Sequence, residues 1–145
     1  MSTPTDLPDV LAIGPMKAGT TWLHEYLKSR GDICLPHGTK ETFFFDRRYE
    51  KGLEWYRAHF RACRDGGYAH TMEVAPSYFH HLEAPQRILE ALGRIQLIVT
   101  LRDPVERSWS HYLHLRRKGY TTLPLRDAVE QFPEIVEASR YATQI

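Results

Sequence analysis

The chain has 145 residues, of which 42% are hydrophobic and 12% aromatic, so it is long enough for one domain and can bury a core. Its 19 lysines and arginines and 18 aspartates and glutamates leave a formal net charge of +1, which argues against nucleic-acid binding, where a strongly basic domain is expected. No apolar run approaches the length of a membrane span, so we expect no membrane insertion.

The N-terminus and the cysteines bear on localisation. Residues 1–9 are polar and contain proline, so we expect a flexible lead. They have neither a basic start nor an apolar core, so no signal peptide is predicted. Cys34 and Cys63 show neither metal-binding nor C-x-x-C spacing, and we expect reduced thiols rather than a disulfide. These features predict a cytoplasmic protein.

The chain then begins with a strand and a helix. Val10–Ile13 is a short apolar run of the kind found in strands that are covered on both faces. Helical spacing follows over Thr20–Arg30, and Gly31 is a natural stop. The apolar face of this helix is expected to consist of Leu23, Tyr26 and Leu27.

The middle of the chain alternates shorter elements. Ile33–Leu35 and Thr42–Phe45 are expected to be strand or loop pieces, and Gly52–Arg61 a helix. His70–Val74 is a second candidate core strand, and Pro85–Leu92 a helix. The inward residues of that last helix are expected to be Ile88, Leu89 and Leu92.

The last part of the chain contains the clearest strand, Ile95–Leu101. Pro104 supplies a first-turn proline for a helix to about Lys118, and a further helix begins at Thr122 and Pro124 and ends at Phe132-Pro133. The buried stripe of the first helix is expected to consist of Val105, Trp109, Tyr112 and Leu113. Strands that alternate with helices predict an α/β fold with a P-loop-like parallel sheet flanked by helices.

The turn after the first predicted strand gives the strongest chemical signal. Gly14 and Gly19 bracket it, and a strand, such a turn and a helix together aim backbone N–H groups at a phosphate. The spacing is close to that of a P-loop, but Thr20 stands where the lysine of a nucleoside triphosphatase belongs, and Lys17 lies inside the loop. The loop therefore indicates an anionic nucleotide donor other than ATP.

Further motifs follow in a fixed order. Pro15–Leu23 reads P-M-K-A-G-T-T-W-L, and Leu97–Tyr112 is an apolar strand that runs into R-D-P-x-x-R-x-x-S-x-Y. Between them lie 40–46 (K-E-T-F-F-F-D), 52–56 (G-L-E-W-Y) and 73–79 (E-V-A-P-S-Y-F). Together they resemble the sulfotransferases that use 3′-phosphoadenosine-5′-phosphosulfate (PAPS), in particular the heparan-sulfate-type branch and its bacterial relatives.

The resemblance implies a sulfotransferase fold, PAPS as donor and 3′-phosphoadenosine-5′-phosphate (PAP) as product. It also implies a carbohydrate or small-molecule acceptor and no metal. Members of this family are usually longer and carry a late glycine-rich loop over the 3′-phosphate and adenine. We therefore expect residues 10–145 to form a single domain that lacks the C-terminal part of the family, as an N-terminal portion or a short form. The sequence gives no indication of the oligomeric state.

The donor-binding residues are predicted from this resemblance and from the chemistry of their side chains. Lys17 suits the leaving phosphate, where negative charge builds up as the sulfuryl group departs. Arg102 ends a buried-looking strand, and its guanidinium can hold the 3′-phosphate through two bonds, together with Ser110. The backbone N–H groups of Ala18, Gly19, Thr20 and Thr21 and the two threonine hydroxyls are expected to hold the 5′-phosphate, and Trp22 is also expected to bind the donor.

The resemblance makes Glu41 the candidate base that deprotonates the acceptor. The aromatic run that begins at Phe43 is expected to desolvate its carboxylate and to raise its pKa. Weaker alternatives are a histidine base, as in cytosolic-type sulfotransferases, with His70, His80 and His81 as candidates. His111 and His114 have metal-ligand spacing, but they are expected to lie, with Arg107 nearby, on a solvated basic helix face.

Two other functions remain open from the residues. A P-loop kinase or nucleotidase would need a lysine at position 20 and an aspartate at the end of a strand to hold magnesium, and Asp103 imitates only the second. The other alternative is a truncated sulfotransferase-like module that binds a nucleotide or a partner without turnover.

Overall fold

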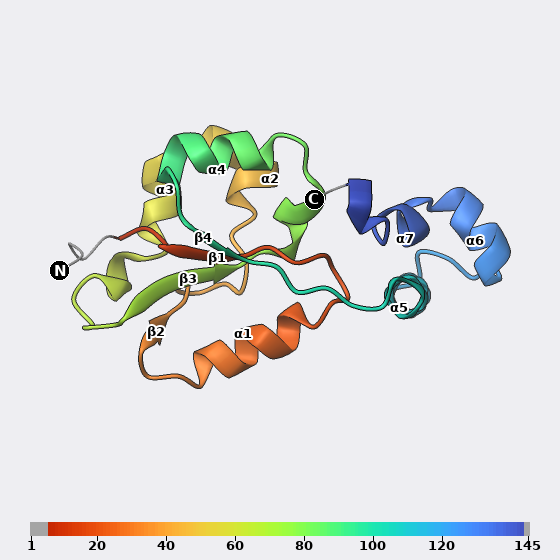
Figure 1. Ribbon diagram of the computed structural model, residues 1–145, viewed down its shortest axis with the longest axis horizontal. Coiled ribbons are helices and arrows are strands. Elements are labelled where there is room, and N and C mark those ends of the chain that lie inside the picture. The colour runs from red at the N-terminus through yellow and green to blue at the C-terminus, as the bar shows by residue number, and fades with distance from the viewer. Residues whose placement is uncertain (1–5, 144–145) are drawn as a thin grey trace.

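A computed structural model describes residues 6–143 of the chain, so residues 1–5 of the expected flexible lead lie outside the described residues. Its centre is a four-stranded parallel sheet with the strand order β2-β3-β1-β4 (Figure 1). The strands are β1 (Val10–Ala12), β2 (Ile33–Cys34), β3 (His70–Val74) and β4 (Gln96–Ile98). The predicted α/β class with a parallel sheet is confirmed.

Helices cover both faces of this sheet. The helices are α1 (Thr20–Lys28), α2 (Phe44–Arg47), α3 (Leu53–Ala58), α4 (Ala84–Leu92), α5 (Pro104–Arg117), α6 (Leu125–Gln131) and α7 (Glu134–Glu137). In Figure 1, α1 lies on one face, α2, α3 and α4 lie on the other, and α5, α6 and α7 form a group beyond one end of the strands.

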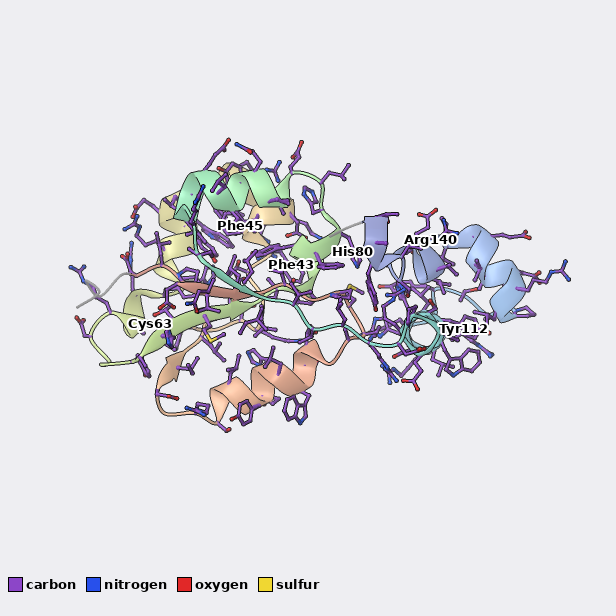
Figure 2. The ribbon with its side chains drawn as sticks, in the orientation of Figure 1. Phe43, Phe45, Cys63, His80, Tyr112 and Arg140 are labelled. Carbon is purple, nitrogen blue, oxygen red and sulfur yellow. A yellow bond between two sulfur atoms is a disulfide. The ribbon has the colours of Figure 1, made fainter. Side chains whose placement is uncertain are left out.

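The core is split in two by the alternation of side chains along β1. Val10 and Ala12 face α1 and pack with Leu27, whereas Leu11 faces the other layer. That layer contains Phe45 of α2, which Figure 2 labels between the sheet and α4. Both faces of β1 are therefore buried, as its continuous apolar run predicts.

Several predicted elements differ from the observed ones. The segment 42–45, expected as a strand or loop, contains the start of α2, because Phe44 and Phe45 must both turn into the aromatic core. The strand expected over 95–101 is only Gln96–Ile98, and it lies at the sheet edge. Leu89 of α4 is 52% exposed and Tyr26 of α1 is 46% exposed, contrary to the expected inward faces.

The prediction for α5 is wrong in a way that matters for the site. Of its expected buried stripe only Tyr112 is buried, whereas Val105 (77%), Trp109 (50%) and Leu113 (45%) are exposed. The buried face instead consists of Arg107, His111, Tyr112 and Leu115. The reason is that α6 and α7 pack against this face and form a separate small core with it.

The prediction of reduced thiols is also wrong. Cys34 of β2 and Cys63 of the short 3₁₀ helix η2 (Arg61–Cys63) form a disulfide between Cα atoms 5.6 Å apart, and Figure 2 labels Cys63. Since disulfides persist mainly in oxidising compartments, the two cysteines do not support the predicted cytoplasmic location. Over residues 6–143, no helix has the length and apolar character needed to cross a membrane.

Candidate active site

Two strand-to-helix connections meet at one end of the sheet. The backbone N–H of Ile13 donates to the carbonyl of Ile98 at 2.9 Å, so the segments after β1 and β4 leave the sheet side by side (Figure 1). A Cβ atom at Gly14 would clash with Thr100, which explains why the first of these turns begins with glycine. In a parallel sheet, this end of the strands is where ligands bind.

The β1–α1 loop has a strained backbone at Lys17, its candidate donor-binding lysine. Lys17 lies at φ 70° and Gly19 at φ 85°, both in the left-handed region. Such a conformation costs a non-glycine residue on the order of 1 kcal/mol and is concentrated at functional sites. The helix α1 then begins at Thr20, and its N-cap residue Gly19 supplies no side-chain cap. The first N–H groups of the helix are therefore suited to an anion.

A cavity of about 360 Å³, called here the loop cavity, lies against this turn. It is lined by Met16, Lys17, Gly19, Thr20, Thr21, Lys40, Pro76, Arg102, Ser110 and His114. It thus brings together most of the residues that the sequence nominates for donor binding, although they come from two segments far apart in the chain.

Two nominated residues do not line this cavity. Ala18 is buried, and the Trp22 side chain is 71% exposed and stacks on Tyr26 at 5.5 Å between ring centroids. Conversely, Lys40 and His114 line the cavity but were not predicted to bind the donor. Lys40 could have been found because it directly precedes the candidate base, and His114 because it lies one helical turn after Ser110.

The loop cavity is rich in positive charge. The pKa of Lys17 is lowered from its usual value, mainly by burial and then by the charges of Arg117, Lys40 and Lys118. The pKa of His114 is lowered as well, by burial and then by Lys17. Because Lys17 is both partly buried and close to other cations, an anion placed beside it would favour its charged form.

Arg102 connects the two segments that form the cavity. Its Nη1 donates to the carbonyl of Lys17 at 3.5 Å, and its Nε pairs with the Glu106 carboxylate at 3.2 Å. Asp103, which could have formed a surface pair with Arg102, instead accepts a bond from the Glu106 N–H at 2.9 Å and caps α5. The guanidinium therefore lies at the cavity, and its one charge partner among residues 6–143 is an exposed carboxylate.

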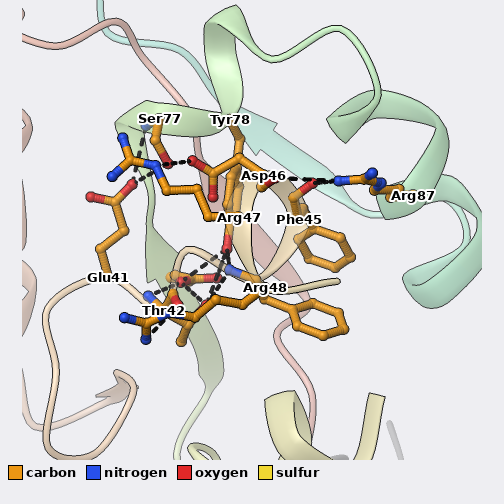
Figure 3. Close-up of polar contacts among 11 residues, drawn as sticks. Glu41, Thr42, Phe45, Asp46, Arg47, Arg48, Ser77, Tyr78 and Arg87 are labelled. Carbon is orange, nitrogen blue, oxygen red and sulfur yellow. Dashed lines mark hydrogen bonds and ion pairs between the residues drawn. The ribbon is translucent and has the colours of Figure 1, made fainter. Parts of the chain in front are cut away.

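Glu41 has the environment expected of a general base. Its Oε1 accepts hydrogen bonds from the Ser77 N–H at 3.1 Å and the Ser77 hydroxyl at 2.6 Å (Figure 3). Burial nevertheless raises the pKa of Glu41, because its effect exceeds that of the two bonds. A carboxylate with a raised pKa is a stronger base than an exposed one.

Glu73 is a buried carboxylate that bonds to the residue after this candidate base. Its carboxylate accepts bonds from the Thr42 N–H and hydroxyl, both at 2.7 Å, and from the Tyr56 hydroxyl at 2.8 Å. Tyr78 adds a bond at 3.2 Å. Since Thr42 follows Glu41 in the chain, Glu73 fixes the backbone that carries the candidate base.

A second cavity of about 530 Å³ adjoins the loop cavity. It is lined by Met16, Asp46, Arg47, Ser77, His80, His81, Arg107, His111, Glu134, Glu137 and Ala138. It shares Met16 with the loop cavity. Glu41 itself lines neither cavity, and its hydrogen bonds to Ser77 connect its carboxylate to the wall of the second one.

The histidines fall into distinct environments. His80, labelled in Figure 2, and His81 line the second cavity. His70 instead bonds to Asp9 at 2.9 Å at the exposed start of β3 and is removed from both cavities. Among residues 6–143, no group of three or more His, Cys, Asp or Glu side chains is arranged to hold a metal ion.

The expected solvated basic face on α5 is wrong for Arg107 and His111, which are both buried. Arg107 donates to the carbonyls of Met16 at 3.3 Å and Ile135 at 2.5 Å and to the Ser139 hydroxyl. It thus ties the β1–α1 loop to α7. Burial and then the charge of Arg107 lower the pKa of His111 to about 4, so His111 is neutral at pH 7.

Comparisons with known proteins agree with this architecture. Residues 7–143 match the family described as "Sulfotransferase domain". The chain is 39% identical over 136 residues to human heparan sulfate glucosamine 3-O-sulfotransferase 3B1, a match that covers 94% of this chain and 32% of the relative. It is 38% identical over 107 residues to membrane-associated sulfotransferase kil1 of Dictyostelium discoideum, covering 73% of this chain and 22% of the relative.

A solved structure of a sulfotransferase from Alicyclobacillus acidocaldarius superposes with a TM-score of 0.80 at 25% identity, covering 95% of this chain and 66% of that one. The chain spans about a third of the length of the human relative (32%). The match extends over nearly all of the described residues and includes both segments that form the loop cavity. The chain therefore belongs to the sulfotransferase family.

Proposed function

We propose that this chain binds PAPS in the loop cavity and transfers its sulfuryl group to a hydroxyl or amine of a carbohydrate or small molecule. The observation that carries the proposal is the convergence of Lys17, Thr21, Arg102 and Ser110 on one cavity rich in cations. PAPS has anionic groups at both its 5′ and its 3′ positions. A ligand of this kind offsets the mutual repulsion of the cations.

The two ends of the donor are assigned to the two segments. The 5′-phosphosulfate lies against the β1–α1 loop, where Lys17 and the start of α1 supply positive charge. The 3′-phosphate lies between Arg102 and Ser110, since a guanidinium can bond two phosphate oxygens at once. Arg102 also bonds to the Lys17 carbonyl, so the two anion sites are held at a fixed separation.

The transfer is an in-line displacement at sulfur. A lone pair of the acceptor oxygen or nitrogen forms a bond to sulfur, and Glu41 takes the proton of that acceptor group. The bond between sulfur and the 5′-phosphate oxygen breaks, and its electron pair stays on the phosphate of PAP. Lys17 stabilises the charge that appears there, while the raised pKa of Glu41 favours proton uptake.

The second cavity is proposed to receive the acceptor. Its wall contains Ser77, the hydrogen-bond partner of Glu41, and it shares Met16 with the loop cavity, which supports an acceptor bound there close to both the base and the donor. The human relative is a heparan sulfate sulfotransferase by name, which supports a carbohydrate acceptor.

The test is transfer of sulfur-35 from labelled PAPS to a panel of amino sugars, glycans and small alcohols, with EDTA present. We compare the wild type with Glu41→Gln and with the matched control Glu54→Gln, an exposed glutamate on α3. Loss of a general base lowers the rate by about 10²–10⁴-fold, so Glu41→Gln is expected to bind PAP but to transfer little label.

The outcomes separate the parts of the proposal. Transfer by Glu41→Gln at the wild-type rate would refute Glu41 as the base. PAP binding without transfer to any acceptor would favour a nucleotide-binding module without turnover. Failure of the folded wild type to bind PAP would refute the donor assignment itself.

A further inference from the structure

Lys40 is a cation at the loop cavity that the proposed roles leave unassigned. It comes from the segment between β2 and α2, and its Nζ donates to the Thr21 hydroxyl oxygen at 2.9 Å, across 19 positions of sequence. The side chain lines the loop cavity together with Lys17 and is half-buried. Within the described part of the chain, no salt bridge joins it to a carboxylate.

The bond from Lys40 orients the Thr21 hydroxyl. An ammonium can only donate, so the Thr21 oxygen accepts through one of its lone pairs. The hydroxyl proton of Thr21 is then directed away from Lys40 and can be donated to an anionic oxygen in the cavity. Lys40 therefore lies one hydrogen bond from the place assigned to the 5′-phosphosulfate.

Lys40 also lies next to the candidate base. It precedes Glu41 in the chain, and its charge acts on both sides of the proposed reaction. It lowers the pKa of Lys17 and opposes the rise in the pKa of Glu41. Its ammonium is therefore close enough to act electrostatically on both the lysine assigned to the donor and the candidate base.

We propose that Lys40 is a further catalytic residue, whose ammonium binds the sulfuryl oxygens of PAPS and stays on them during transfer. This inference rests on the proposed function. Lys17 stabilises the negative charge on the phosphate oxygen that keeps the electron pair of the broken bond. Lys40 contacts the sulfuryl group that is transferred. Lys40 keeps its proton throughout, since Glu41 takes the proton of the acceptor.

The experiment compares PAPS with PAP, which lacks only the sulfuryl group, by calorimetric titration without an acceptor. The variants are Lys40→Met, Lys40→Arg and the control Lys51→Met, which removes the same charge from an exposed lysine on the 3₁₀ helix η1 (Tyr49–Lys51). Loss of one charge-assisted hydrogen bond weakens binding by about tenfold. Lys40→Met should show this loss for PAPS but at most about a twofold loss for PAP.

Lys40→Arg should restore the preference for PAPS in large part, and Lys51→Met should bind both nucleotides as the wild type does. Equal weakening of PAPS and PAP binding in Lys40→Met would overturn the inference, because Lys40 would then serve the phosphates alone. Unchanged binding of both nucleotides would overturn it too. A wild type that binds neither nucleotide would instead refute the proposed function, and this inference with it.

Discussion

Replacing Glu73 by alanine should destabilise the fold and release the candidate base. The Glu73 carboxylate is fully buried and accepts bonds from Thr42 and Tyr56. After the change, the Thr42 N–H and the Tyr56 hydroxyl lose this acceptor in a dry interior, which costs about 1–3 kcal/mol for each group. We expect the free energy of unfolding to fall by about 4 kcal/mol, equivalent to a fall in Tm of roughly 10 °C for a domain of this size.

Glu73→Gln separates the hydrogen bonds from the charge. The glutamine carbonyl can accept both bonds from Thr42, and its amide can donate to the Tyr56 hydroxyl. We therefore expect the free energy of unfolding to stay within about 1.5 kcal/mol of the wild-type value. Burial raises the pKa of Glu73, so the folded state holds this proton more tightly than the unfolded state. The wild type should therefore gain stability relative to Glu73→Gln as the pH falls through the folded pKa of Glu73.

The assay is urea and thermal unfolding, followed by circular dichroism and tryptophan fluorescence, with Glu50→Ala as a control at an exposed glutamate. A Glu73→Ala protein that unfolds within about 1 kcal/mol of the wild type would refute the reasoning, because no buried donor would then depend on this carboxylate.

Two further predictions concern the charge of the loop and the disulfide. The pKa of Lys17 is lowered, and on the proposed function its ammonium binds PAP. PAP affinity should therefore decline with rising pH, and the decline should begin at a lower pH than for an ordinary lysine. Calorimetry across the alkaline range checks this, and Lys17→Arg, which stays charged, should abolish the decline; a decline that persists in Lys17→Arg would contradict it. Cys34→Ser with Cys63→Ser opens a link across 29 positions and should cost about 3.5 kcal/mol in urea unfolding. Unfolding of this double variant at the wild-type midpoint would show that the disulfide adds nothing.

The sequence predicted those parts of the fold and site that depend on local pattern. The strand His70–Val74 has the predicted bounds, and Lys17, Arg102 and Ser110 meet in one cavity, because the carboxyl ends of neighbouring parallel strands lie together. Glu41 was nominated from its motif, and its raised pKa agrees with the expected desolvation.

What the sequence did not predict depends on tertiary packing. The buried face of α5 was wrong because the partners that cover Arg107 and His111, including the unpredicted α7, come from a later segment. The pairing of Cys34 with Cys63 depends on how the segment after α3 returns to β2. The contact of Lys40 with Thr21 likewise joins two loops that no periodicity relates.

The most direct test of the central claim is a crystal structure of the protein in complex with PAP. We expect the 5′-phosphate at the β1–α1 loop against Lys17 and Thr21, and the 3′-phosphate between Arg102 and Ser110. PAP bound in the second cavity, or with its 3′-phosphate away from Arg102, would contradict the account.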